Sequence, residues 1–176
     1  MDNLTLIIPA KNENESLPIF LDELKNYNCK KLIIIQRDDV STKQSVLEDD
    51  NTKILYQKIN GYGGAIIEGI NNSTTKFSCI INADGSMNPK YLEEMLNICI
   101  NQDLVFASRY IKPTGGSDDD TIVTFIGNKI FTFLGNFLYK LNLSDILFTY
   151  ILGKTSSFKN LDLNSRDFRL CVELPI

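Results

Sequence analysis

Short apolar runs alternate with longer amphipathic segments through the first two thirds of the chain. Runs with little polar interruption predict buried strands, at Leu4–Pro9, Leu32–Ile35, Lys53–Gln57, Phe77–Ile81 and Leu104–Ser108. Apolar residues at helical spacing predict helices, at Glu15–Asn26, Ser41–Glu48, Gly64–Asn72 and Lys90–Ile100. This alternation predicts an α/β fold in which helices flank a mainly parallel sheet.

The last third of the chain follows a different pattern. Ile122–Leu152 is a long apolar stretch, rich in aromatic side chains. A core or dimer helix would have this composition, and so would a helix at a membrane interface. Phe168–Ile176 is predicted to be a further strand. The acidic run Asp118–Asp120 is predicted to be a solvated loop that caps a helix.

Polar residues gather where the predicted strands end. The segments PAKNENE, QRDDVST, KINGYGGA, NADGS and SRY follow the five strands in order. Ligands bind at the carboxyl ends of the strands in open parallel sheets, so these segments predict a binding site along one edge.

Asn82 and Asp84 are the sharpest candidates, because they stand one residue apart directly after a buried strand. An acid in this position is costly unless it is capped, paired or bound to a metal. Mg²⁺ and Mn²⁺ bind one or two protein carboxylates together with phosphate oxygens. Asp84 would hold such a cation, with Asn82 supplying a neutral oxygen. The alternative is a turn that Asp84 closes over Ser86.

The other strand ends each allow two interpretations. Glu13 either helps to start the first helix or faces a ligand. Asp38 and Asp39 either lie in a solvated loop or accept hydrogen bonds from the base or ribose of a nucleotide. Arg109 either pairs with a carboxylate or binds a phosphate through two parallel hydrogen bonds.

Three glycines, Gly61, Gly63 and Gly64, precede a predicted helix. They would let backbone N–H groups approach an anion at the helix N-terminus, although a plain turn would use the same residues. The spacing is not G-x-G-x-x-G and the motif follows the third strand, which argues against a nicotinamide dinucleotide site. The sequence also contains no P-loop pattern.

The composition excludes several classes of function. The 176 residues include no histidine, which excludes a Ser-His-Asp triad, a Cys-His pair and any His-ligated metal. A formal net charge of −4 argues against a nucleic-acid-binding protein. The four cysteines form no C-x-x-C pair, which predicts free thiols in a reducing, cytoplasmic compartment. A signal peptide is not expected, because the N-terminus has no basic leader. A membrane-spanning helix is not expected either, because the sequence has no long uncharged apolar run.

Five motifs in order carry a resemblance to a known family. They are IIPAKNENESL, RDDVST, NGYGGAIIEGI, INADGSMNPKYLEEML and FASRYIKPTGG. Together they resemble the family 2 glycosyltransferases of GT-A fold, and within them the dolichyl- and polyprenyl-phosphate sugar transferases. The resemblance covers nearly the whole chain and implies a single GT-A domain. Residues 1–110 would form its nucleotide-binding part and residues 111–176 its acceptor-side part.

The resemblance implies an inverting enzyme that transfers a sugar from a nucleotide-diphosphate sugar, with Mg²⁺ or Mn²⁺ as cofactor. The implied acceptor is a lipid phosphate at a membrane surface. The implied location is the cytoplasm, with the protein binding peripherally at the inner face of the membrane. A homo-oligomer is one possible assembly. The implied catalytic residues are Asp84, Arg109 and Asp145, and the implied metal ligands are Asn82, Asp84 and Ser86. The implied nucleotide-sugar contacts are Pro9, Glu13, Asp39 rather than Asp38, Gly61, Gly63, Gly64, Asn82 and Ala83.

Three departures from the family pattern stand out. Val40 occupies a position where glycine is usual, Asn82 replaces the first acid of an Asp-x-Asp pair, and the chain ends at CVELPI, where relatives continue with a basic segment. From this ending we expect either a minimal member of the family or a truncated chain. Asparagine keeps an oxygen but loses a charge, so we expect a weakened cation site that fills once the donor is bound. The alternative function is a nucleotide-sugar-binding homologue with little or no transferase activity.

Overall fold

The computed structural model describes residues 1–111 and 121–176, so the acidic run Asp118–Asp120 lies outside the described residues. Its strands form one sheet in the order β3-β2-β1-β4-β6-β5. The strands are β1 (Leu4–Pro9), β2 (Lys30–Ile35), β3 (Thr52–Tyr56), β4 (Phe77–Ile80), β5 (Leu104–Phe106) and β6 (Ile151–Lys154). The α-helices are α1 (Ser16–Glu23), α2 (Val40–Gln44), α3 (Tyr62–Asn72), α4 (Leu92–Cys99), α5 (Ile122–Tyr139), α6 (Thr155–Asn160) and α7 (Leu170–Glu173). The predicted α/β architecture is therefore confirmed.

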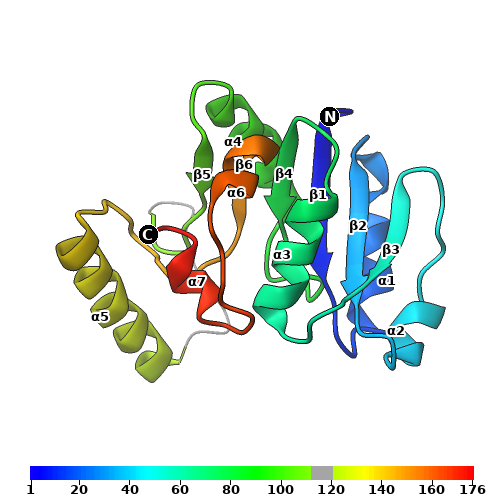
Figure 1. Ribbon diagram of the computed structural model, residues 1–176, viewed down its shortest axis with the longest axis horizontal. Helices are drawn as coiled ribbons and strands as arrows, with labels where there is room; N and C mark the ends of the chain where they lie inside the picture. The colour runs from blue at the N-terminus through cyan, green and yellow to red at the C-terminus, as the bar shows by residue number, and fades with distance from the viewer. Residues whose placement is uncertain (112–120) are drawn as a thin grey trace.

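Strand direction brings the predicted polar segments to one edge of the sheet. The neighbours β1, β2, β3 and β4 pair in parallel. β6 pairs antiparallel with both β4 and β5, so β5 again runs in the direction of β4. All five strands predicted from the sequence consequently end at the same edge, which lies at the bottom of Figure 1.

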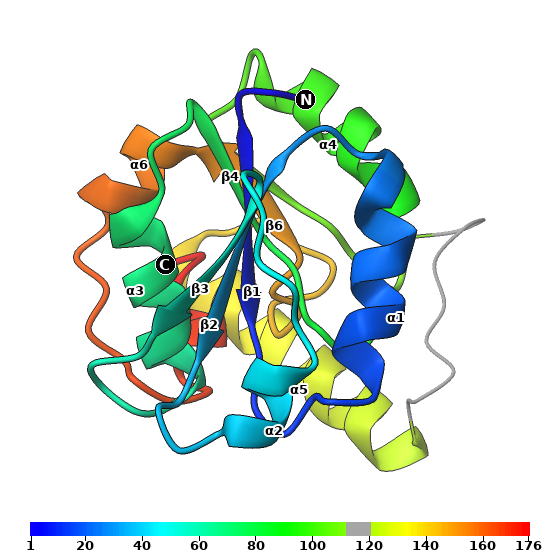
Figure 2. The ribbon, with the colours of Figure 1, turned by 90° about the vertical axis from the view of Figure 1, so that its right-hand side faces the viewer.

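Alternating residues of β1 enter two separate cores. Leu4, Leu6 and Ile8 pack with buried residues of α1 and α4 on one face. Ile7 packs on the other face with α3, α6 and α7. Figure 2 shows the sheet between these two layers of helices. Both faces of the sheet are thus covered, which is why the strand sequences are almost continuously apolar.

The C-terminal prediction was wrong. Phe168–Ile176 alternates apolar and other residues as a strand would, but the structure forms the short helix α7 there. Leu170 and Leu174, four residues apart, both become buried against the α3 face of the sheet. The strand that completes the sheet is β6, whose apolar start was hidden inside the long apolar stretch.

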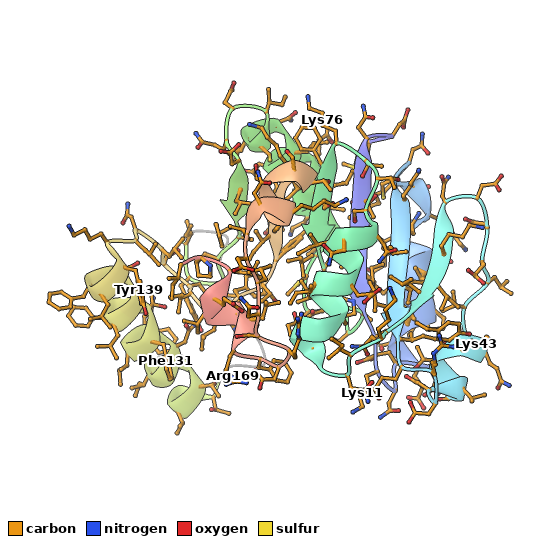
Figure 3. All side chains as sticks on the ribbon, in the orientation of Figure 1. Lys11, Lys43, Lys76, Phe131, Tyr139 and Arg169 are labelled. Carbon is orange, nitrogen blue, oxygen red and sulfur yellow. The ribbon has the colours of Figure 1, made fainter. Side chains whose placement is uncertain are left out.

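Helix α5 has its polar face inward and its apolar face outward. Asn128 and Thr132 are buried, and Asn128 donates to Asp145 at 2.6 Å. The outward face carries Val123, Phe125, Ile126, Ile130, Phe131, Phe133, Leu134, Phe137, Leu138 and Tyr139, all of them exposed. Figure 1 places α5 at the margin of the molecule, and Figure 3 labels Phe131 and Tyr139 along this helix. Within the described part of the chain, no helix combines the length and apolar character needed to cross a bilayer.

Candidate functional site

An open cavity of about 740 Å³ lies at the carboxyl edge of the sheet. It is lined by Pro9, Ala10, Lys11, Glu13, Gln36, Gln57, Asn60, Gly61, Tyr62, Ala65, Asn82, Ala83, Asp84, Asp167 and Phe168. The ends of β1, β2, β3 and β4 all contribute, together with the start of α3 and the segment before α7. Lys11 is labelled along this edge in Figure 3. The structure thus assembles the predicted binding edge around one cavity, which is large enough for a nucleotide.

Asp84 stands exposed at the mouth of this cavity and forms a local turn. Its Oδ1 accepts hydrogen bonds from the backbone N–H of Ser86 at 2.9 Å and from the Ser86 hydroxyl at 2.6 Å. This is the turn given as the alternative from the sequence. It leaves Oδ2 without a hydrogen bond from the described residues, so the turn and a cation site are compatible.

Asn82 is held by a tyrosine from the start of α3. The Tyr62 hydroxyl donates to Asn82 Oδ1 at 2.9 Å and lies 2.6 Å from the Thr149 hydroxyl. The Tyr62 ring stacks on Phe168, with centroids 4.8 Å apart. Burial raises the pKa of Tyr62 well above its ordinary value, so the phenol keeps its proton. Tyr62 therefore fixes the Asn82 side chain at the cavity wall.

The glycine motif is packed against the chain itself. A Cβ on Gly61 would lie 2.2 Å from the carbonyl oxygen of Arg166, and one on Gly63 would lie 2.3 Å from that of Ser165. The Gly64 N–H donates to the Arg166 carbonyl at 3.0 Å. Gly61 and Gly63 thus let the segment before α7 approach α3 closely. The predicted part of these glycines in binding an anion stays a prediction, and the Gly64 N–H is already engaged.

Asp39 links two loops at the same edge without lining the cavity. It is buried and caps α2, where its carboxylate accepts from the Thr42 N–H at 3.1 Å. It also accepts from the Asn12 N–H at 2.7 Å. Burial acts to raise the pKa of Asp39, but the hydrogen bonds from Asn12, Thr42 and Ser41 outweigh it and hold the pKa below the ordinary range. Asp38 is exposed and lies outside the lining, whereas Glu13 is part of it.

Arg109 and Asp145 form an ion pair away from the cavity lining. Arg109 Nε donates to Asp145 Oδ2 at 2.8 Å, and Arg109 Nη2 donates to Oδ1 at 3.0 Å. Asp145 also accepts from the Arg109 backbone N–H and from Asn128, and its side chain is 0% exposed. The carboxylate thereby joins the end of β5 to α5. The catalytic roles implied for this pair stay predictions, since both partners are occupied with each other.

Several lining residues were not selected from the sequence. Lys11 and Gln36 follow β1 and β2 in the polar segments, and Gln57 follows β3, so their place at strand ends was a usable signal. Gln57 shapes the loop before α3, because its Nε2 donates to the Gly61 carbonyl at 2.8 Å. Asp167 and Phe168 reach the cavity through the return of the C-terminal segment, for which the local sequence offers no signal.

The charged residues at the cavity could hold a cation only together with an anionic ligand, which would supply the remaining coordinating oxygens. Glu13, Asp84 and Asp167 contribute carboxylates, and Lys11 is the basic residue among the described lining residues. No three acidic or cysteine side chains cluster closely enough to hold a metal by themselves in residues 1–111 and 121–176. Asp84, with the Ser86 hydroxyl beside it, would supply the protein's share of a Mg²⁺ or Mn²⁺ site whose other ligands are phosphate oxygens.

The family is established by comparison with known proteins. The family model described as glycosyl transferase family 2 matches residues 5–162. The chain belongs to glycosyltransferase family 2. This family 2 chain is 26% identical over 173 residues to an undecaprenyl-phosphate mannosyltransferase of Micrococcus luteus, covering 90% of this chain and 69% of that protein. An uncharacterized glycosyltransferase of Mycobacterium tuberculosis is 28% identical over 99 residues, which cover 53% of this chain and 44% of the relative.

Solved structures confirm that the family 2 chain has the GT-A fold. Mannosyl-3-phosphoglycerate synthase from Rubrobacter xylanophilus matches with a TM-score of 0.69 at 14% identity, covering 89% of this chain and 54% of that one. Glucosyl-3-phosphoglycerate synthase from Mycobacterium tuberculosis, in complex with Mn²⁺, uridine diphosphate and phosphoglyceric acid, matches with a TM-score of 0.69 at 10% identity. It covers 97% of this chain and 62% of that one. The family 2 chain thus spans little more than half the length of these proteins.

Proposed function

We propose that this family 2 chain transfers a sugar from a nucleotide-diphosphate sugar to an acceptor. The observation that carries the proposal is the single cavity where Pro9, Glu13, Asn82, Ala83 and Asp84 meet at the carboxyl edge. Residues 1–110 would provide most of the donor site, whose lining Asp167 and Phe168 complete, and the rest of residues 111–176 would form the acceptor side. Relatives named as glycosyltransferases support the reaction type.

The proposed reaction inverts the anomeric carbon. An acceptor oxygen forms a bond to that carbon on the face opposite the nucleotide, while the bond to the diphosphate oxygen breaks. The nucleoside diphosphate leaves with the electron pair. A phosphate acceptor is already ionised near neutral pH and needs no strong general base, which agrees with a chain that contains no histidine.

The cavity offers few protein groups that could neutralise the negative charge of the donor's diphosphate, since Lys11 is the basic residue among the described lining residues. A divalent cation, when bound, would neutralise charge on the leaving diphosphate. Asp84 would anchor it from the protein side, and Lys11 lies on the same lining to meet a phosphate oxygen. The structure of the Mycobacterium tuberculosis synthase with Mn²⁺ and uridine diphosphate supports this cofactor class.

The nucleotide proposal predicts ligand binding that depends on a divalent cation. Uridine or guanosine diphosphate should raise the melting temperature more with Mn²⁺ present than in excess chelator, because the lining carries more carboxylates than ammonium groups. Thermal shift with both nucleotides, with and without Mn²⁺, checks it. Equal shifts in chelator would contradict a cation site. Binding without release of nucleoside diphosphate from any nucleotide sugar, tested with a polyprenyl phosphate and with phosphoglyceric acid, would favour the alternative of a binding homologue.

We propose a lipid phosphate as the acceptor, with α5 lying on the membrane surface. α5 is about 27 Å long, its outward face is apolar and aromatic, and its charged residues within Ile122–Tyr139 reduce to Lys129. Lys140 follows at its end. An apolar face edged by lysines suits the interface of a membrane that contains anionic lipids. The name of the Micrococcus luteus relative, an undecaprenyl-phosphate mannosyltransferase, supports this acceptor class.

The membrane proposal predicts binding to vesicles through α5. The chain should sediment with vesicles of anionic and zwitterionic phospholipid, and replacing both Phe133 and Phe137 by serine should weaken this binding about tenfold or more. Phe133 and Phe137 are 68% and 74% exposed, so the fold should tolerate the change. Ile19→Ser, at an equally exposed position on α1, is the matched control. Unchanged binding by the double variant would contradict the proposal; dimers without vesicle binding would make a second copy the partner.

A further inference from the structure

The Tyr62 hydroxyl has one proton, and the geometry determines where it goes. It is donated to Asn82 Oδ1 at 2.9 Å. The Thr149 hydroxyl, 2.6 Å away, must therefore be the donor in its contact with the Tyr62 oxygen. The three residues come from the loop before β6, the start of α3 and the end of β4, so the chain of bonds runs from Thr149 through Tyr62 to Asn82.

This chain of bonds orients the two ends of the Asn82 amide. The oxygen is turned toward Tyr62, and the nitrogen, which carries two N–H donors, has no hydrogen-bond partner among the described residues. Asn82 lines the cavity between Ala83 and the start of α3. An amide nitrogen at a cavity wall is suited to an oxygen acceptor in the ligand. The oxygen is turned toward Tyr62, so the nitrogen is the polar atom of the amide that is left for a ligand.

We infer that Asn82 donates a hydrogen bond to an oxygen of the donor's diphosphate, and that Tyr62 is the positioning residue that presents the amide for it. The inference rests on the proposed nucleotide-sugar site. It reassigns the replaced acid: with carboxylates at Glu13, Asp84 and Asp167 on the same lining, a further acid would repel the diphosphate, whereas an amide attracts it. Asp84 then remains as the carboxylate for the cation, and part of the donor binding no longer depends on the metal.

The test is a cycle of variants titrated by calorimetry with uridine and guanosine diphosphate, in EDTA and in excess Mn²⁺. Asn82→Ala and Tyr62→Phe should each lower the affinity about tenfold in EDTA, the size expected for a hydrogen bond to a charged group. The double variant should lose no more than one of them, because both changes remove the same bond. Asn82→Asp should bind more weakly than Asn82→Ala in EDTA, since it adds a charge. Thr149→Val should repeat part of the loss, and Thr149→Ser should restore it.

Tyr62→Phe keeps the ring that stacks on Phe168, so the fold is expected to survive. Tyr27→Phe, which removes a hydroxyl before β2 at the opposite edge of the sheet, is the matched control and should bind as the unchanged chain does. Affinities within twofold for Asn82→Ala and Tyr62→Phe, or losses that add in the double variant, would overturn the inference while leaving the proposed function intact. If the nucleotides bind only with Mn²⁺, the affinities of the same variants are compared in Mn²⁺, and the same two outcomes would overturn the inference. Binding of neither nucleotide in any condition would overturn both.

Discussion

Replacing Asp84 by asparagine should lower the rate of sugar transfer about a hundredfold or more, the range seen when one charge-stabilising group is removed from an active site. Asp84 lines the cavity, and one of its carboxylate oxygens accepts two hydrogen bonds from Ser86 while the other accepts none from the described residues. Asparagine preserves the turn, because its oxygen can accept the same two bonds. The loss would therefore report the missing charge and not a rearranged loop.

Release of nucleoside diphosphate measures this effect, with a polyprenyl phosphate as acceptor and Mn²⁺ as cation. Asp50→Asn is the matched control, because Asp50 is also exposed but precedes β3 at the opposite edge of the sheet. If transfer is too slow to follow in the unchanged chain, the same pair is compared by the gain in nucleotide affinity on adding Mn²⁺. Equal behaviour of the two variants would show that the cation does not depend on Asp84.

Replacing Asp145 by alanine should lower the free energy of unfolding by about 3–5 kcal/mol, the cost of breaking a buried ion pair by removing one of its members. Asp145 accepts two bonds from the Arg109 guanidinium, one from the Arg109 backbone and one from Asn128. The substitution removes the carboxylate that accepts two bonds from the guanidinium, and it also removes the attachment of α5. Urea unfolding, followed by circular dichroism, gives the difference in free energy.

The control for this prediction is an ion pair at the surface. Asp103 accepts from Lys154 Nζ at 2.8 Å, but its side chain is 71% exposed, so Asp103→Ala should have a much smaller effect. A similar loss from both substitutions would mean that the Asp145 pair is not effectively buried. Normal stability of Asp145→Ala with abolished transfer would instead support the catalytic role implied by the family resemblance.

Local sequence patterns predicted the strands of the sheet better than they predicted the C-terminal helix α7. Continuous apolar runs identified β1 to β5, because strands covered on both faces need apolar residues at every position. The polar residues after those runs did gather at one cavity, since parallel direction brings strand ends together. The segment from Phe168 was misassigned because apolar residues at positions 168, 170, 172 and 174 fit a strand, whereas the helix that forms buries Leu170, Cys171 and Leu174.

Contacts between distant residues account for what the sequence could not provide. Tyr62 meets Thr149 across 87 positions of the chain, and Arg109 meets Asp145 across 36. Each of these residues looks ordinary within its own segment, so its partner follows only from the order of strands in the sheet. The same holds for the carbonyl of Arg166, which reaches the glycines only after the chain has crossed the sheet.

The contact between the glycines and the segment before α7 is made by backbone atoms on both sides. The two sides of the contact are therefore expected to tolerate substitution to different degrees in evolution. The carbonyl oxygens of Ser165 and Arg166 would be present whatever side chains those positions carried. Gly61, at a φ of 117°, and Gly63 have no room for a Cβ beneath those oxygens. Substitutions at positions 165 and 166 therefore preserve the contact, whereas a residue larger than glycine at position 61 or 63 would disrupt it. The C-terminal segment can change its surface chemistry, and with it the wall that it adds to the cavity, while keeping its place in the fold.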